Sequence, residues 1–165
     1  MTITLSEFRR QADKHGICEM SAEWDNCKSK KQLIDLALSI RGIEYIAKAI
    51  SDGWGIDADT ICREFAPFNY GKYVRDKDGY TSAMYCRFGS TKLPMPIEAT
   101  QTAILVIEHT GSIYVPKNRI CEIHLVNSDS VIYGEGKAKV YSYGSTVRYD
   151  VNTKCDITVV KKAKQ

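Results

Sequence analysis

The chain has 165 residues, a formal net charge of +3, and 44% hydrophobic and 26% charged residues. This length suits one domain, or a small helical unit joined to a small β unit, and it can bury a core without disulfides or metal. The start, MTITLSEFRR, lacks the apolar run of a secretory signal, and no stretch approaches the roughly 18 apolar residues of a membrane span. We therefore expect a cytosolic protein with reduced, mostly buried thiols.

The charges divide the chain near Ala66. Residues 1–66 hold nine Lys and Arg against eleven Asp and Glu, whereas residues 67–165 hold fourteen against nine. Nine of the ten tyrosines also lie in the second part. A basic segment rich in tyrosine is typical of a nucleic-acid or protein contact, but strands use tyrosine in any case.

Residues 1–66 predict a helical unit. A capping box at Thr4 and Glu7 begins a helix that runs to Lys14 and stops at Gly16. Further helices are expected at 18–24, from the Ser29–Gln32 capping box through Ile40 with a break or kink at Gly42, over 43–50, and from Asp57 or Asp59 through Phe65, ended by Pro67.

Residues 67–99 predict a β-hairpin followed by a connector. In KYVRDKDGYTSAMYCRF the Asp78-Gly79 pair supplies the positive φ that tight turns need. Pro94 and Pro96 make KLPMPIEAT an extended connector.

Residues 100–160 predict a unit of short strands, and 161–165 a basic tail. We expect strands at AILVIE, SIYVP, ICEIHLV, SVIYG, AKVYSYG, TVRYDV and CDITVV. Small residues precede Val131, Val140 and Val147, which favours valines filling the inside of a narrow stack. The predicted class is therefore α+β, with a solenoid-like stack of short strands or, alternatively, a small β-sandwich.

Two pieces of the chain resemble uncharacterised phage and prophage proteins that have a short helical N-terminal element and a β-coil tail. The first piece, 16–46, carries Gly16, Cys18, Ala22, Trp24, Arg41, Gly42 and Tyr45 at corresponding places. The second piece, 112–150, carries a recurring Val-x-x-Tyr-Gly motif. Ile46 and Ala47 depart from the aromatic residues expected there. The resemblance implies a phage or mobile-element origin and an anti-CRISPR type of inhibitor, and it brings no catalytic residue.

The sequence predicts no enzyme, no metal site and no cofactor. Cys121 and His124 are an odd number of residues apart, so they face opposite sides of a strand and cannot form a nucleophilic pair. The pair of His15 and Cys18 remains the alternative for a thiol enzyme. Asp76 and Asp78 fit a turn, because the other ligands of a calcium loop are missing.

A binding surface is the stronger prediction, and it lies first on the hairpin. Basic side chains next to tyrosines suit phosphates and bases, and equally a protein interface. The predicted contact residues of the hairpin are Lys72, Tyr73, Arg75, Lys77, Tyr80, Tyr85 and Arg87. In the tail, alternation places Lys139, Tyr141 and Tyr143 on one outward side, with Ala138 and Val140 inward.

We therefore expect a non-enzymatic binding protein that blocks a host defence complex by occupying a protein or guide-RNA surface. A CRISPR-Cas effector is the most concrete expected partner. The chain itself is expected to be a monomer or small homo-oligomer, without a membrane contact. The alternatives are a self-assembling β module of a phage particle and an RNA-binding module.

Overall fold

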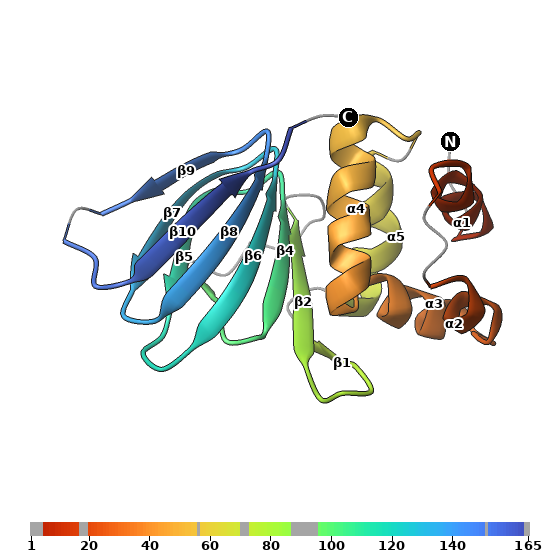
Figure 1. Cartoon of the computed structure of the whole chain (residues 1–165), viewed down its shortest axis with the longest axis horizontal. Coiled ribbons are helices and arrows are strands. Elements are labelled where there is room, and N and C mark those ends of the chain that lie inside the picture. Colours follow the sequence, from red (N-terminus) through yellow and green to blue (C-terminus); the bar gives the residue numbers. More distant parts are fainter. Residues whose placement is uncertain are drawn as a thin grey trace.

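The computed structural model describes residues 5–16, 20–55, 57–69, 73–86, 96–150 and 152–163, which form five helices followed by ten strands (Figure 1). The helices are α1 (Leu5–Lys14), α2 (Ser21–Asp25), α3 (Lys30–Ala37), α4 (Ile40–Asp52) and α5 (Ala58–Asn69). The strands are β1 (Tyr73–Arg75), β2 (Thr81–Cys86), β3 (Ile97–Glu98), β4 (Ala103–Ile107), β5 (Thr110–Val115), β6 (Ile120–Val126), β7 (Asp129–Gly134), β8 (Lys137–Tyr143), β9 (Thr146–Tyr149) and β10 (Asp156–Lys161).

The predicted capping box at the start of α3 is confirmed. The Ser29 hydroxyl accepts a hydrogen bond from the Gln32 N–H at 3.2 Å. The Gln32 side-chain oxygen accepts in turn from the Lys28 N–H at 2.6 Å. The end of α1 before Gly16, at φ 74°, is confirmed as well, whereas the Thr4 cap lies outside the described residues.

The long helix expected after Ser29 is two helices, and the prediction of a break at Gly42 was wrong. The chain turns at Ser39, whose hydroxyl accepts from the Gly42 N–H at 3.3 Å and so caps α4. Gly42 lies in the first turn of α4. A Cβ there would lie 2.1 Å from the Ala37 carbonyl oxygen, so the close approach of α3 and α4 requires glycine.

Helix α5 extends beyond the expected end. Its start agrees with the sequence, because the Asp57 carboxylate accepts from the Thr60 N–H at 2.7 Å. Its end does not, since the helix passes Pro67 and stops at Asn69. Proline costs the helix one backbone hydrogen bond. The burial of Phe65 against the sheet stabilises the same helical segment and offsets that loss.

The strands form two sheets between which the chain alternates. Sheet A has the order β1-β2-β4-β6-β8-β10, and sheet B has the order β3-β5-β7-β9. All neighbours are parallel except β1 and β2, which form the predicted antiparallel hairpin. Each passage from sheet A to sheet B and back is one turn of a flattened β-solenoid, as the sequence favoured over a sandwich. The seven strands predicted in 100–160 are all present.

The repeat of the solenoid is longer than the valine spacing suggested. Ala103 pairs with Glu122 and Glu122 with Lys139, so one turn takes roughly 17 to 19 residues. Val131 and Val140 belong to different sheets. The prediction that Val131 fills the inside was wrong, because in β7 the alternate residues, such as the fully buried Ser130, point inward.

One corner of the solenoid has the same backbone conformation in three successive turns. Glu108, Asn127 and Gly144 have φ values of 49°, 48° and 66°. The residues that follow them, His109, Ser128 and Ser145, are joined by a ladder of hydrogen bonds from one turn to the next. Ser128 Oγ accepts from the His109 N–H at 3.1 Å, and Ser145 Oγ accepts from the Ser128 N–H at 2.9 Å. These bonds satisfy buried corner amides and join the turns.

Two hydrophobic cores lie on the two faces of sheet A. Between the sheets, one column of inward side chains runs through Ile104, Ile123 and Val140, all fully buried. On the other face, α4 and α5 cover side chains such as Leu105 and Val126. Figure 1 shows the resulting order of layers: sheet B, sheet A, α4 with α5, and then α1 to α3.

Candidate functional site

A groove of about 710 Å³ separates the hairpin from the helical layer, and we call it the hairpin–helix groove. It extends from the hairpin turn along the end of sheet A. It is lined by Met20, Glu23, Asn26, Cys27, Gln32, Asp35, Leu36, Ser39, Ile40, Arg41, Val74, Arg75, Asp76, Lys77, Asp78, Tyr80, Thr102 and Glu122.

The hairpin wall is held by its turn. The Asp76 carboxylate accepts hydrogen bonds from the N–H groups of Asp78 and Tyr80, both at 2.9 Å. Gly79 takes φ 84°, as the Asp-Gly pair predicted. Arg75 donates to the Gly79 carbonyl at 3.2 Å. This bonding gives the turn one conformation and leaves its charged ends and the Tyr80 ring exposed.

The helical wall carries ion pairs of its own. Arg41 lies 3.5 Å from Glu23, which joins the start of α4 to α2. Lys31 lies 2.7 Å from Asp35 along α3. These pairs are exposed and contribute little to stability, but they order charges of both signs along the groove.

The base of the groove is apolar. Met20 and Val74 are buried, and Leu36 and Ile40 are partly buried beside them. Thr102 closes the base on the sheet side, where its hydroxyl accepts from the Thr81 N–H at 3.3 Å. A ligand seated here would replace water on apolar side chains and meet charged groups at the rim.

A ladder of polar and aromatic side chains continues from the groove across sheet A. Glu122, a groove residue, pairs in register with Lys139, and His124 pairs with Tyr141. The His124 and Tyr141 rings are stacked, with centroids 4.8 Å apart. The neighbouring His124 imidazole, and then Lys139, lower the pKa of Glu122 below its ordinary value. Lys162 also contacts this ladder, with its Nζ 5.1 Å from the Tyr141 ring centre.

The structure brings together part of the predicted hairpin site. Arg75, Lys77 and Tyr80 line the groove. Tyr73 is exposed beside it, with the Arg75 guanidinium 5.8 Å from its ring centre. Lys72 and Arg87 lie outside the described residues.

Two predicted contact tyrosines are buried, and those predictions were wrong. Tyr85 is 5% exposed because it points between the sheets. Tyr143 is 3% exposed because the helical layer covers that end of sheet A, and burial raises the pKa of its hydroxyl. Lys139 is exposed as expected, and Tyr141 is half-buried under lysine and histidine neighbours.

The sequence reasoning missed the helical wall and Glu122. These residues come from segments separated by up to a hundred positions, and each alone looks like an ordinary solvated side chain. Arg41 was noted only for the resemblance. The local signal available in the sequence was that Ser29 and Ser39 cap the starts of α3 and α4, close to charged residues of both signs. The position of these helix starts opposite the hairpin arises only from the fold.

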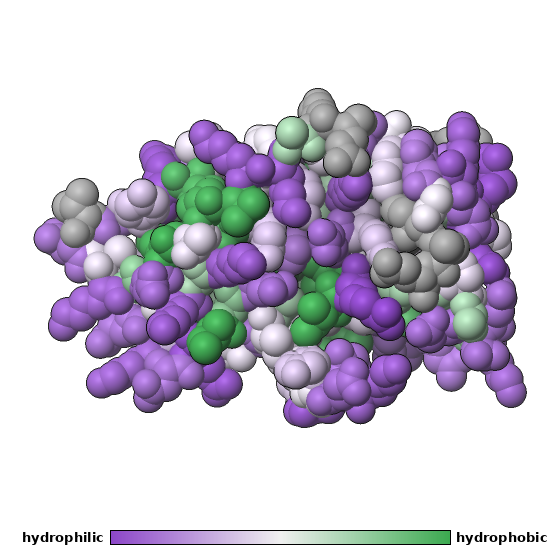
Figure 2. All heavy atoms as spheres, viewed as in Figure 1, coloured by the Kyte–Doolittle hydropathy of each residue, from purple (hydrophilic) through white to green (hydrophobic). Residues whose placement is uncertain are grey.

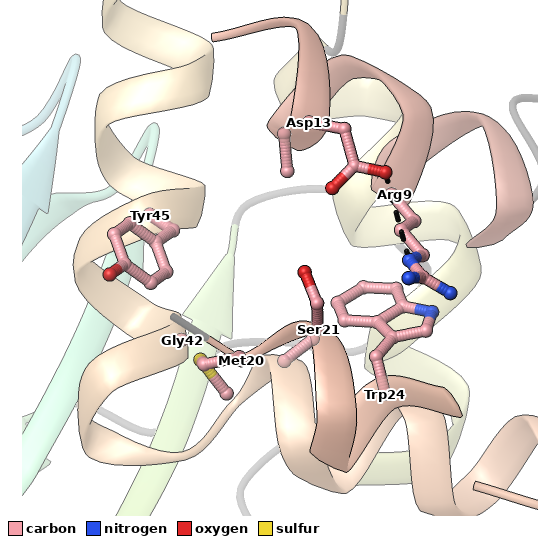
Figure 3. A pocket seen from close by; sticks show the side chains of 9 residues that line it. Arg9, Asp13, Met20, Ser21, Trp24, Gly42 and Tyr45 are labelled. Carbon is pink, nitrogen blue, oxygen red and sulfur yellow. Dashed lines mark ion pairs between the residues drawn. The ribbon is translucent and has the colours of Figure 1, made fainter. Parts of the chain in front are cut away.

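A second, smaller cavity lies within the helical layer (Figure 3). It has about 30 Å³ of space, enough for roughly one water, between α1, α2 and α4. Arg9, paired with Asp13 at 3.8 Å and with Asp25, stands at its edge, and Trp24 and Tyr45 form its sides. Its size suits packing between helices better than a ligand.

The described histidines and thiols of the strand unit are buried side chains. Cys121 points between the sheets, and burial raises the pKa of its thiol to about 12. His124 lies on the opposite face, as the odd spacing predicted. His109 is fully buried, which lowers its pKa, and neither ring nitrogen has a hydrogen-bond partner among the residues that the structure describes. The His15–Cys18 alternative lies partly outside the described residues.

The comparisons with known proteins add no relative. The chain matches no family, no curated protein and no solved structure. Across the described ranges, no helix is both long and apolar enough to cross a membrane. The same residues contain no group of three or more His, Cys, Asp or Glu side chains placed to hold a metal ion.

Proposed function

We propose that this chain is a non-enzymatic binding protein that holds a segment of a partner protein in the hairpin–helix groove. The observation that carries the proposal is the lining of that groove: an apolar base between walls that bear charges of both signs. A protein segment offers apolar anchors together with mixed charges, whereas a nucleic-acid backbone offers phosphates of one sign.

The charges of the groove favour protein over RNA. Three cationic residues line it, Arg41, Arg75 and Lys77, against five carboxylates. Arg41 is already near Glu23. Phosphates would therefore meet repulsion from the walls, while a peptide with lysine or arginine next to apolar side chains would be attracted.

The adjoining ladder is also a poor base-stacking platform. The Tyr141 ring is stacked with His124, and the ammonium groups of Lys139 and Lys162 lie 5.3 and 5.1 Å from its centre. Stacking of a base requires an open aromatic face. Among residues close to the groove, Tyr80 and Tyr73 offer more exposed rings.

The resemblance to phage and prophage proteins suggests the first partner to test. We propose that the chain binds a host defence ribonucleoprotein, a CRISPR-Cas effector in the first instance, and blocks it sterically through a protein surface. What supports this is the resemblance together with a groove suited to a protein segment.

The test pairs a variant of the groove with a matched control. Arg75→Glu with Lys77→Glu changes two exposed groove cations, and Lys117→Glu changes an exposed lysine in the turn between β5 and β6 that does not line the groove. Each protein is expressed in cells with an active CRISPR-Cas system that are then infected by a targeted phage. The wild-type and Lys117→Glu proteins should raise plaque counts, and the groove variant should not.

A direct measurement identifies the contact. A photo-crosslinking residue at Tyr80 should form a covalent adduct with a protein subunit of the purified effector, and one at Lys117 should not. An adduct with guide RNA would favour the RNA-binding alternative. Equal protection by all variants, or no adduct at Tyr80, would refute the groove as the binding site.

A further inference from the structure

Among the described residues, the edge of the solenoid formed by β9 and β10 is unpaired. Strands β9 and β10 are the last strands of sheets B and A, and in the described chain no strand pairs with their outer edges. The inward column that continues Val140 ends in Val159, which is 37% exposed. Tyr149, in register with the buried Ile132, is 58% exposed. Figure 2 shows an apolar patch on the surface over β9 and β10.

The hydrogen-bond register fixes which backbone groups of β10 point outward. The N–H groups of Asp156 and Lys162 donate to Gly136 and Ser142 of the β8 side, at 3.0 and 2.8 Å. In a parallel pair alternate residues bond to the same neighbour, so residues 156, 158, 160 and 162 face β8. The N–H and C=O groups of Ile157, Val159 and Lys161 therefore point away from the sheet.

We propose that β10 pairs with β10 of a second copy, antiparallel and about a two-fold axis at Val159. In an antiparallel pair only outward-facing residues exchange hydrogen bonds, so Val159 must face an odd-numbered residue of the second copy. Pairing Val159 with itself aligns the whole strand. Ile157 then lies opposite Lys161, and the inward valines meet at the axis.

This register also matches the charges. It places Asp156 of each copy directly opposite Lys162 of the other, on the same face of the sheet, so the two-fold axis forms two opposite-charge pairs. Lys162 already lies 3.9 Å from Glu44, so a second carboxylate would reinforce its position. If the second copy is shifted by two residues in either direction, one end of each strand is left without a partner strand. Both Asp156–Lys162 pairs are then lost.

The pairing closes on itself, so the product is a dimer. A two-fold contact uses the same edge in both copies and leaves no second β10 edge free. The dimer surface is distinct from the hairpin–helix groove, and one test can fail without the other.

The first test removes a backbone donor. Proline at an outward-facing position of an edge strand loses no bond within the sheet. Val159→Pro should therefore fold, as judged by its circular dichroism, yet remain monomeric in sedimentation velocity where the wild-type chain dimerises. Val159→Ala keeps the N–H and should retain the dimer. A wild-type chain that stays monomeric at high concentration overturns the proposal, as does a Val159→Pro dimer.

The second test reads the register through charge reversal. Asp156→Lys alone and Lys162→Asp alone each place like charges opposite one another, and each should weaken self-association at least about tenfold. An equimolar mixture should form a heterodimer, and the double variant D156K/K162D should dimerise again. Failure of the mixture to associate rejects this register, and a growing assembly in place of a dimer rejects the two-fold closure.

Discussion

The two Tyr-Gly pairs of the solenoid look equivalent in the sequence, yet the structure predicts different tolerance for their glycines. Gly134 has φ 131°, and a Cβ there would lie 2.2 Å from the Val115 carbonyl oxygen. Gly144 has φ 66°, and its nearest contact would be the Asn127 side chain at 3.2 Å. We therefore compare Gly134→Ala with Gly144→Asn.

The expected cost at Gly134 has two parts. A side chain in that region of backbone space costs about 1–3 kcal/mol. Relieving the overlap also displaces the Val115 carbonyl, which accepts from the N–H groups of Glu135 and Gly136 at 3.0 and 3.1 Å. Each such bond contributes about 1 kcal/mol. The free energy of unfolding should therefore fall by about 4 kcal/mol.

Gly144→Asn should cost below about 1 kcal/mol, because Glu108 and Asn127 already adopt left-handed φ at the same corner of earlier turns. Urea unfolding followed by far-ultraviolet circular dichroism measures both changes. A Gly134→Ala protein within about 1 kcal/mol of wild type, or equal losses in the two variants, would refute the close-approach argument.

Three further predictions concern buried polar groups. Burial lowers the pKa of His109, so as the pH falls this histidine is protonated in the unfolded chain before it is protonated in the folded chain. The free energy of unfolding should therefore decrease below about pH 6.5, by at most about 1.4 kcal/mol per pH unit from this residue. His109→Leu should lose this component in urea titrations at several pH values, and identical pH profiles would contradict it. Ser128→Ala leaves the buried His109 N–H without its acceptor and should lower the free energy of unfolding by about 1–3 kcal/mol, whereas a neutral change would show that the ladder is dispensable. Cys121, buried with a pKa near 12, should be alkylated at pH 8 only on unfolding, as read by mass spectrometry, and rapid labelling of the native protein would show that the strands open.

Local signals in the sequence were reliable where a few neighbouring residues decide the outcome. The Ser29–Gln32 cap, the Asp57 cap and the Asp78-Gly79 turn all depend on contacts within a few positions, and all are present. The seven short strands were likewise visible as alternating patterns. The helix break was misplaced because Ser39 and Gly42 are one capping unit, a choice that depends on how α4 packs on α3.

The predicted contact residues are exposed only where no other layer of the fold covers them. Alternation alone places Lys139, Tyr141 and Tyr143 on one face, and they do share that face. The strand pattern contains no information on where α4 crosses the sheet, so it could not show that Tyr143 is covered while Lys139 is exposed. The strand pattern was equally uninformative for Tyr85. Its side chain is buried because sheet B packs on that face of β2, which the sequence of β2 does not indicate.

The sequence by itself determined the α+β order of elements, the hairpin turn and the stack of short strands, because capping, turn chemistry and side-chain alternation act over a few residues. The tertiary structure alone decided the roughly 17- to 19-residue turn, the layer that covers the outer face of sheet A and the groove between hairpin and helices. Those features arise from contacts between segments far apart in the chain, such as helix α4 with strand β6 and Glu122 with Lys139. Such contacts depend on packing between complete elements, which no short window of sequence contains.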